Sequence, residues 1–229
     1  MISPRTRLLL LTLLACLVLA AGCGSLSPLG TARTLSPGKI VWSSGVNFVG
    51  TPTGREDAPG SGSQMEVGFS AGLSSRLELG IRAFGVPATR EWMWGLDTQL
   101  KVQLVRSKNR NRGVNLALAP RASFQQLGTA GATWEAATTH LAVMVGINLP
   151  GGNEVVISPQ IGGLFLMDRE TEAVEALVGG GSIGFAWKVA HCVTLMPNLT
   201  ILYSTLRMDD HRNVWFYRVS LLFMLGERD

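Results

Sequence analysis

The sequence predicts an all-β protein, an antiparallel up-and-down transmembrane β-barrel of ten strands that follows an N-terminal signal helix. Beyond Gly38, apolar residues fall on every second position and almost nowhere at helical spacing, which is the pattern of strands with two unlike faces. The alternating segments are even in number, and short and longer connections alternate between them. Barrels that span a bilayer share these features, because a closed sheet leaves no backbone group unpaired in lipid.

The segment RLELGIRAFG, residues 76–85, shows the alternation: Leu77, Leu79 and Ile81 share one face, opposite Glu78 and Arg82. The expected strands are 39–49, 64–73, 76–85, 92–105, 114–126, 137–149, 154–167, 179–190, 193–205 and 214–225. Short connections are expected at 74–75, 106–112, 151–152 and 191–192, and longer ones at 50–63, 86–91, 127–136, 168–178 and 206–213. Merging two segments would give eight strands.

The composition of the two faces favours a membrane barrel over a soluble one. A soluble barrel would turn its apolar stripe inward and present Lys and Glu to water. Here the polar stripe has little charge and many small residues, which suit a narrow bore. Its small residues include Gly68, Ser70, Gly72, Asn115, Ala117, Ala119, Ser123, Ala142, Gly146, Asn148, Ser182, Gly184, Ala186, Asn198, Thr200 and Ser204. The stripe expected to face acyl chains includes Val143, Val145, Ile147, Ile157, Ile161, Phe165, Phe185, Leu195, Leu199, Ile201, Val219, Leu221 and Phe223.

Tryptophan residues lie near both ends of the expected strands. Trp92, Trp94 and Trp215 adjoin the longer connections, and Trp42 and Trp187 lie towards the short turns. Two aromatic girdles at the membrane interfaces would have this distribution.

Proline occurs on the expected outer stripe of three strands, at Pro120, Pro159 and Pro197. Because proline has no backbone donor, each position predicts a bulge or a local gap in the hydrogen-bond ladder.

The N-terminus has the pattern of a secretory signal. Arg5 and Arg7 precede an apolar stretch from Leu8 to Ala21, which is too short for a comfortable transmembrane helix. The residues Ala20-Ala21-Gly22-Cys23 resemble the lipobox of bacterial lipoproteins. This resemblance implies cleavage before Cys23, acyl chains on Cys23, and residues 1–22 as a lipoprotein signal peptide. An ordinary signal peptide with an incidental cysteine is the alternative.

Three regions follow: the signal peptide 1–22, a flexible tether 23–37 rich in Ser, Gly and Pro, and a barrel domain 38–229. Loss of Arg5 and Arg7 with the signal lowers the formal charge from +4 to +2, an excess too small for a nucleic-acid binder. The three cysteines form no disulfide framework or metal-ligand spacing, and no cofactor is expected.

The pattern of residues 39–225 resembles the small outer-membrane β-barrel proteins of Gram-negative bacteria, and the hairpin GLSSRLELGIRAFG resembles those of barrel families often described as transporters. The resemblance implies the outer membrane as location, contacts with its lipid and lipopolysaccharide, and the tether and short turns in the periplasm. Such barrels commonly end on an aromatic residue, whereas this chain continues past Phe223 to Asp229.

The stripe expected to line the lumen carries seven basic and three acidic residues: Lys39, Glu66, Arg76, Glu78, Arg82, Asp97, Lys101, Arg121, Lys188 and Arg218. Desolvated charges must pair, so we expect a salt-bridge network that plugs a thin barrel. Its expected members are Glu66, Glu78, Arg82, Asp97, Lys101, Arg121, Lys188 and Arg218. Under the alternative, the excess positive charge lines a narrow path for a small anion.

Enzymatic activity is not expected. Asp209-Asp210-His211 is similar to part of the catalytic group of omptin proteases, but that family's second acidic pair has no counterpart in GVPATREW. His140 points to the lumen by phase, and no nucleophile motif surrounds any serine.

We therefore expect a lipid-anchored outer-membrane barrel with a structural role or a role as a narrow small-solute conduit. A soluble lipocalin-like barrel lipoprotein that binds an apolar ligand inside is the alternative, and an omptin-like surface hydrolase is a third.

Overall fold

The computed structural model describes residues 30–50, 62–86, 92–129, 132–168, 174–208 and 211–226. The strands are β1 (Ile40–Gly50), β2 (Gly62–Ser74), β3 (Leu77–Val86), β4 (Trp92–Val105), β5 (Gly113–Thr129), β6 (Ala132–Leu149), β7 (Asn153–Asp168), β8 (Val174–Ala190), β9 (Val193–Met208) and β10 (His211–Leu225). A one-turn 3-10 helix, η1 (Pro150–Gly152), connects β6 to β7. Within these residues, no helix has the length and apolar character needed to cross a bilayer.

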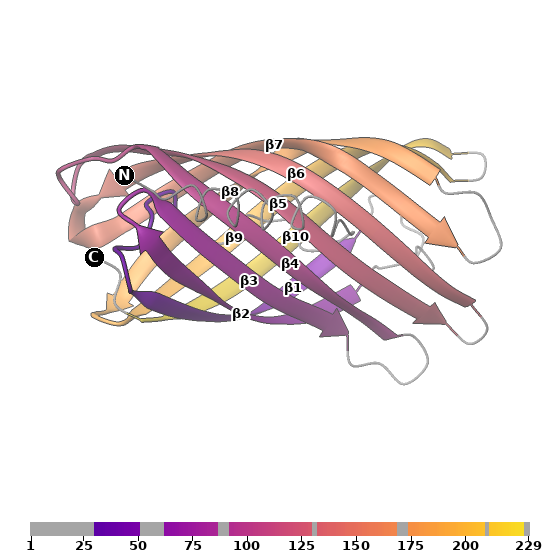
Figure 1. Cartoon of the computed structure of the whole chain (residues 1–229), viewed down its shortest axis with the longest axis horizontal. Coiled ribbons are helices and arrows are strands. Elements are labelled where there is room, and N and C mark those ends of the chain that lie inside the picture. The colour runs from indigo at the N-terminus through magenta and orange to yellow at the C-terminus, as the bar shows by residue number, and fades with distance from the viewer. Residues whose placement is uncertain are drawn as a thin grey trace, which may run out of the picture.

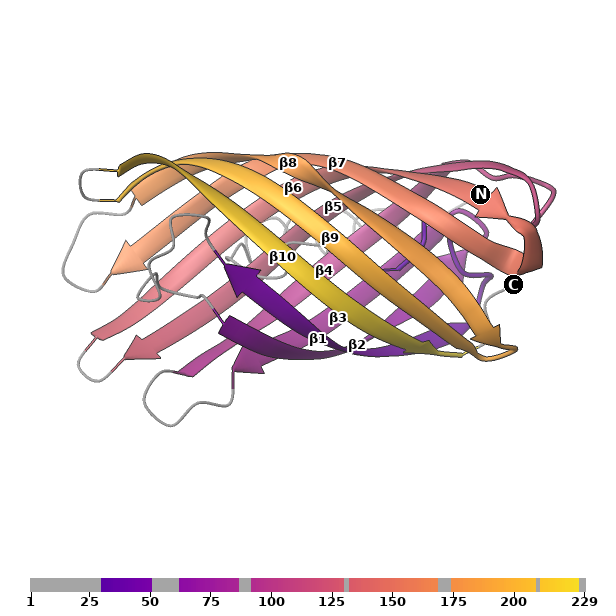
Figure 2. The ribbon, with the colours of Figure 1, turned by 180° about the vertical axis from the view of Figure 1, so that it is seen from behind.

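The ten strands form one closed antiparallel barrel, which confirms the predicted fold and strand number. Each strand pairs with its neighbours in sequence, and β1 closes the barrel by pairing with β10, from Trp42 opposite Leu225 to Gly50 opposite Tyr217. The strands are steeply tilted against the long axis (Figures 1 and 2). The four short turns lie together at one end, on the left in Figure 1, and we call it the short-turn end.

The predictions of longer connections at 127–136 and 206–213 are wrong. The β5–β6 ladder continues to Thr129 opposite Ala132, and the β9–β10 ladder continues to His211 opposite Met208. The sequence there is polar or glycine-containing and lacks the apolar alternation. A hairpin satisfies its backbone hydrogen bonds whatever its side chains, so pairing continues beyond the apolar stripe.

The outer face is apolar, as the strand phases predict. The predicted lipid-facing residues are exposed or half-exposed, among them Ile161 at 55% and Ile201 at 46%. Trp42, Trp92, Trp94, Trp187 and Trp215 are all exposed at 41–59%. These values confirm the predicted outward phase of the strands.

Aromatic pairs reinforce both ends of this face. Trp42 packs on Phe69 near the short-turn end, with ring centroids 5.6 Å apart. Tyr203 and Trp215 pack at 5.0 Å towards the opposite end. The two aromatic girdles predicted from the sequence are therefore present on the outer face.

Each of the three prolines interrupts the ladder with the preceding strand, as predicted. Pairing between β4 and β5 stops at Gln99–Arg121 and resumes at Val102–Leu118, on either side of Pro120. Equivalent gaps separate β6 from β7 around Pro159 and β8 from β9 around Pro197. The pairs that the prolines keep with the following strand are Pro120–Leu141, Pro159–Gly181 and Pro197–Leu221.

The interior is packed in layers, and it is more apolar than the predicted lining of small polar residues. The half towards the short-turn end holds one apolar cluster: Ala32, Leu35, Val41, Ala117, Ala119, Ala142, Met144, Val156, Ala186, Met196, Leu222 and Met224. A smaller cluster of Leu164, Ala176, Val178 and Leu202 lies towards the opposite end. The lumen also holds many buried polar and charged side chains.

The segment Gly30–Gly38 enters the lumen at the short-turn end, and we call it the strap. Ala32, Thr34 and Leu35 are each at most 3% exposed. The prediction of a flexible tether over 23–37 is therefore wrong for residues 30–36, because they are buried or half-buried within the barrel. The remainder of the tether, the signal peptide and Cys23 lie outside the described residues.

Candidate functional site

Five charged side chains cross the middle of the lumen, and we call them the arginine belt: Arg218 of β10, Glu66 of β2, Arg82 of β3, Asp97 of β4 and Arg121 of β5. Arg82 joins the two acids, donating to Glu66 Oε2 at 3.0 Å and to Asp97 Oδ2 at 2.6 Å. Arg218 donates to Glu66 at 2.5 Å, and Arg121 donates to Asp97 at 3.1 Å. The alternating charges link five strands across the bore.

Neutral amides extend the arginine belt. Asn47 of β1 donates to Glu66 Oε2 at 3.1 Å, and Arg121 donates to Gln160 of β7 at 3.5 Å. Glycines on the wall make room for the long side chains: a Cβ at Gly68 would lie 3.0 Å from Arg82 Cβ, and one at Gly45 would lie 3.1 Å from Glu66 Oε1. Small residues and long charged residues thus complement each other across the bore.

A second ion pair ties the strap to the wall. Lys101 of β4 donates to Glu78 Oε1 of β3 at 2.7 Å, and the other oxygen of Glu78 accepts the Leu35 backbone N–H at 2.8 Å. One step along the strap, the Thr34 N–H donates to Gln103 Oε1 at 2.7 Å. The backbone donors of an irregular segment are therefore satisfied by side chains from the barrel wall.

Two wall glycines accommodate the strap. A Cβ at Gly72 of β2 would lie 2.1 Å from the carbonyl oxygen of Ser36, and one at Gly146 of β6 would lie 2.8 Å from Ala32 Cβ. The Gly38 N–H also donates to the Gly72 carbonyl at 2.9 Å. Since β2 and β6 lie on different sides of the barrel, the strap crosses the bore from wall to wall.

The predicted lumen charges divide into two groups. Glu66, Glu78, Arg82, Asp97, Lys101, Arg121 and Arg218 are buried, each at most 4% exposed. Lys188 is only half-buried and lies at the mouth, away from the arginine belt. Arg76, expected on the same stripe, is instead exposed in the β2–β3 turn, and Lys39 is half-buried beside the strap.

Glu154 of β7 is a lumen charge that the sequence analysis missed. It is 5% exposed, and its Oε1 accepts a hydrogen bond from Asn115 Nδ2 at 3.3 Å. Ile157 and Ile161 of the same strand point outward, so the alternation places residue 154 inside. The sequence pattern could therefore have predicted Glu154 as a lumen charge. Within the described residues, four acidic and four basic side chains are buried, so the fully buried charges balance, while Lys39 and Lys188 of the same predicted stripe are half-buried.

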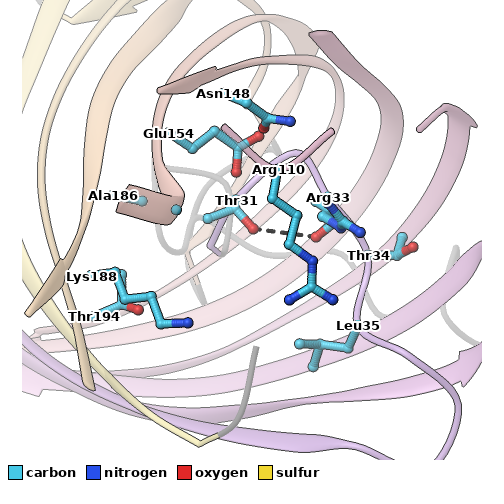
Figure 3. Close-up of a pocket in the computed structure, with 11 residues that line it drawn as sticks. Thr31, Arg33, Thr34, Leu35, Arg110, Asn148, Glu154, Ala186, Lys188 and Thr194 are labelled. Atoms are coloured by element: carbon cyan, nitrogen blue, oxygen red, sulfur yellow. Dashed lines mark hydrogen bonds between the residues drawn. The ribbon is translucent and has the colours of Figure 1, made fainter. Parts of the chain in front are cut away.

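A pocket of about 70 Å³ opens at the short-turn mouth beside the strap. Its charged lining is Arg33 of the strap, Arg110 of the β4–β5 turn, Glu154 and Lys188 of β8. Figure 3 shows the Arg110 guanidinium and the Lys188 ammonium pointing into it.

The structure describes only some of the candidate catalytic residues. Asp209 and Asp210 lie outside the described residues, and of His211 only the backbone is described, at the start of β10. His140 is buried in the lumen at 5% exposure, and no hydrogen bond from the described part of the chain reaches its Nδ1. Across the described ranges, no group of three His, Cys, Asp or Glu side chains is placed to hold a metal ion.

No protein-family model matches the sequence, and no curated protein matches it. Among solved structures, the chain is similar to the translocator domain of the autotransporter NalP from Neisseria meningitidis, with a TM-score of 0.43, 10% identity and 98% of each chain covered. It is also similar to the toluene transporter TbuX of Ralstonia pickettii, with a TM-score of 0.35, 10% identity, and 93% of this chain and 97% of that chain covered. For Ail, the attachment invasion locus protein of Yersinia pestis, the TM-score is 0.25 and the identity 6%, over 82% of this chain and 97% of that chain. Similarity this distant transfers no function to this chain.

Proposed function

We propose that the chain is a lipid-anchored outer-membrane barrel whose lumen is closed, so that its role is structural unless the strap is displaced. The observation that carries the proposal is the burial of the arginine belt, whose members are each at most 4% exposed. Charges that line an open aqueous pore stay hydrated. These charges are paired with one another, and the lumen also contains two clusters of buried apolar side chains.

Insertion in a bilayer is supported by the outer face. Exposed large apolar side chains occur on nine of the ten strands, for example Phe48, Leu141 and Phe223 at 41–59% exposure, and on β3 the outward Leu77, Leu79 and Ile81 are half-exposed. Monomeric soluble proteins rarely expose continuous apolar patches beyond a few hundred Å². Among the outward side chains described, the carboxylates of Glu135 and Glu175 lie near the strand ends opposite the short-turn end. A lipid-facing band flanked by aromatic residues explains this distribution.

The short-turn end is proposed to face the periplasm. Gly30, the first residue of the strap, follows Cys23 by seven positions. At about 3.5 Å per extended residue, this separation spans about 25 Å at most. Acyl chains on Cys23 would therefore insert in the leaflet nearest the short-turn mouth, which for an outer-membrane lipoprotein is the inner one.

Electrical recording in planar bilayers tests the closed lumen. The wild-type protein is expected to show no single-channel steps. A variant with residues 30–37 replaced by a Gly-Ser sequence of equal length, and with Arg82→Ser and Asp97→Ser, is expected to conduct. This variant loses both the strap and the centre of the arginine belt. Steady conductance by the wild-type protein would contradict the proposal.

The structure gives no support to an apolar-ligand site inside the barrel. The lumen is crossed by the arginine belt and by the strap, and its apolar clusters are packed side chains. The lipocalin-like alternative requires the opposite strand phase, with apolar stripes turned inward around a cavity.

A further inference from the structure

We propose that the pocket at the short-turn mouth binds a small phosphate-type oxyanion through Arg110 and Lys188, beside Arg33 of the strap. This site is separate from the closed-lumen function, because none of its basic residues belongs to the arginine belt. It would give the barrel a ligand on the side where the strap enters.

Three separate elements bring the basic side chains together. Arg33 comes from the strap, Arg110 from the seven-residue β4–β5 turn at 106–112, and Lys188 from the end of β8. They are far apart in sequence and meet only because the barrel is closed and the strap is seated. Convergence of cations from several elements on one pocket is how proteins commonly recognise an anion.

The charge of the pocket is unbalanced. Three basic side chains and one acidic side chain, Glu154, line it, which gives a net charge of +2. The Glu154 carboxylate already accepts a hydrogen bond from Asn115 and lies against Gly146 on the wall. Within the described residues, no carboxylate pairs with the Arg110 guanidinium or the Lys188 ammonium. Bringing like charges together is unfavourable, and a bound anion would relieve the repulsion.

The size and polar lining of the pocket define the ligand class. A pocket of about 70 Å³ holds several water molecules, and thus a compact anion rather than a sugar or an acyl chain. Thr194 adds a hydroxyl to the lining, and the Asn148 amide is occupied, because its Nδ2 donates to the Asn109 carbonyl at 2.9 Å. A tetrahedral oxyanion can accept from a guanidinium group and an ammonium at once, here those of Arg110 and Lys188.

Binding would also stabilise the closed barrel. Arg33 and Thr31 belong to the strap, so the complete site exists only when the strap is inside the lumen. A ligand that needs the seated strap must favour that state by the same free energy. Phosphate is therefore expected to slow proteolysis at Arg33.

Isothermal titration of the full-length protein in a neutral detergent with inorganic phosphate tests the site. Arg110→Gln and Lys188→Gln are each expected to weaken binding about tenfold, the loss of one charge-assisted hydrogen bond. Arg112→Gln is the matched control, because Arg112 lies exposed in the same turn and does not line the pocket. Absence of binding by the wild-type protein, or equal weakening by Arg110→Gln and Arg112→Gln, would overturn the proposal.

A second arm identifies the source of the phosphate group. The titration is repeated in nanodiscs of phosphatidylcholine with and without phosphatidylglycerol. Equal affinity for inorganic phosphate in the two kinds of nanodisc supports a soluble anion as the ligand. Competition by phosphatidylglycerol that Arg110→Gln abolishes supports a lipid headgroup in the same site.

Discussion

Asp97 lies between two guanidinium groups at the centre of the barrel. Its Oδ2 accepts from Arg82 at 2.6 Å and from Arg121 at 3.1 Å, and the residue has no exposed surface. A charge in this position is compensated only by its partners, because water does not reach it. Loss of the carboxylate therefore leaves buried positive charge with less compensation.

Asp97→Asn is expected to lower the free energy of unfolding by about 3–5 kcal/mol, the cost of removing one partner of a buried pair. Urea denaturation of the protein in lipid vesicles, followed by tryptophan fluorescence, measures it. Glu175→Gln removes a carboxylate exposed on β8 and is expected to leave the midpoint unchanged. An equal effect of the two substitutions would show that burial of the arginine belt does not govern stability.

The strap fills space inside the barrel that the side chains of the wall leave open. A ten-stranded barrel is wider than the eight-stranded barrel whose interior side chains just fill the bore. The backbone of the strap occupies the extra space beside Gly72, because this glycine has no side chain. The close approach at this glycine explains why the strap lies where it does.

Gly72→Val is expected to displace the strap, because a Cβ at this position would lie 2.1 Å from the Ser36 carbonyl oxygen and 2.8 Å from that of Leu35. Trypsin should then cleave after Arg33 at least about tenfold faster, since a cleavable bond must first leave its packed site. Gly163→Val is the control, because a Cβ there has its nearest neighbour at 3.4 Å, on the Phe165 ring. Equal cleavage rates in both variants would argue against a seated strap.

The prolines give a second test at the level of the strand. Pro159→Val supplies a backbone donor in the gap between β6 and β7, and we expect about 0.5–1.5 kcal/mol of added stability from the restored hydrogen bond. Ile161→Val, on the same outer stripe, changes no donor and serves as the control. A decrease in the urea midpoint of Pro159→Val would show that the gap is required for the curvature of the wall.

At the scale of the whole molecule, apolar side chains lie on both faces of the barrel wall. Outside, they are exposed over the strands, and inside, they form two buried clusters in the same lumen as the arginine belt. A molecule of this kind should resist unfolding in detergent, because its sheet is closed and has no unpaired edge strand.

Two independent features, the acyl chains on Cys23 and the apolar outer face of the barrel, are predicted to hold the protein in the membrane. Cys23→Ser is expected to abolish acyl labelling, whereas the protein should still resist carbonate extraction and still migrate differently on a gel before and after boiling. The reason is that the barrel buries its apolar face in lipid without help from an anchor. Release of the Cys23→Ser variant by carbonate would show that the acyl chains, and not the strands, hold the protein.

The sequence by itself determined the number of strands, their phase, the tryptophan positions and the ladder gaps at the prolines. These features follow from local rules: period-two alternation fixes which face a side chain joins, and a missing donor must break a ladder. The same phase placed Arg82, Asp97 and Arg218 inside the barrel. It would also have placed Glu154 there.

Only the tertiary structure decided which charges meet and what fills the bore. Glu66 and Arg218 are 152 positions apart and pair because β10 closes onto β1, next to β2. The strap has a composition typical of a flexible linker, and it is ordered by Gly72, Glu78 and Gln103 on a wall that forms only when the barrel closes. Contacts between distant segments depend on the curvature and closure of the sheet, which no local pattern encodes.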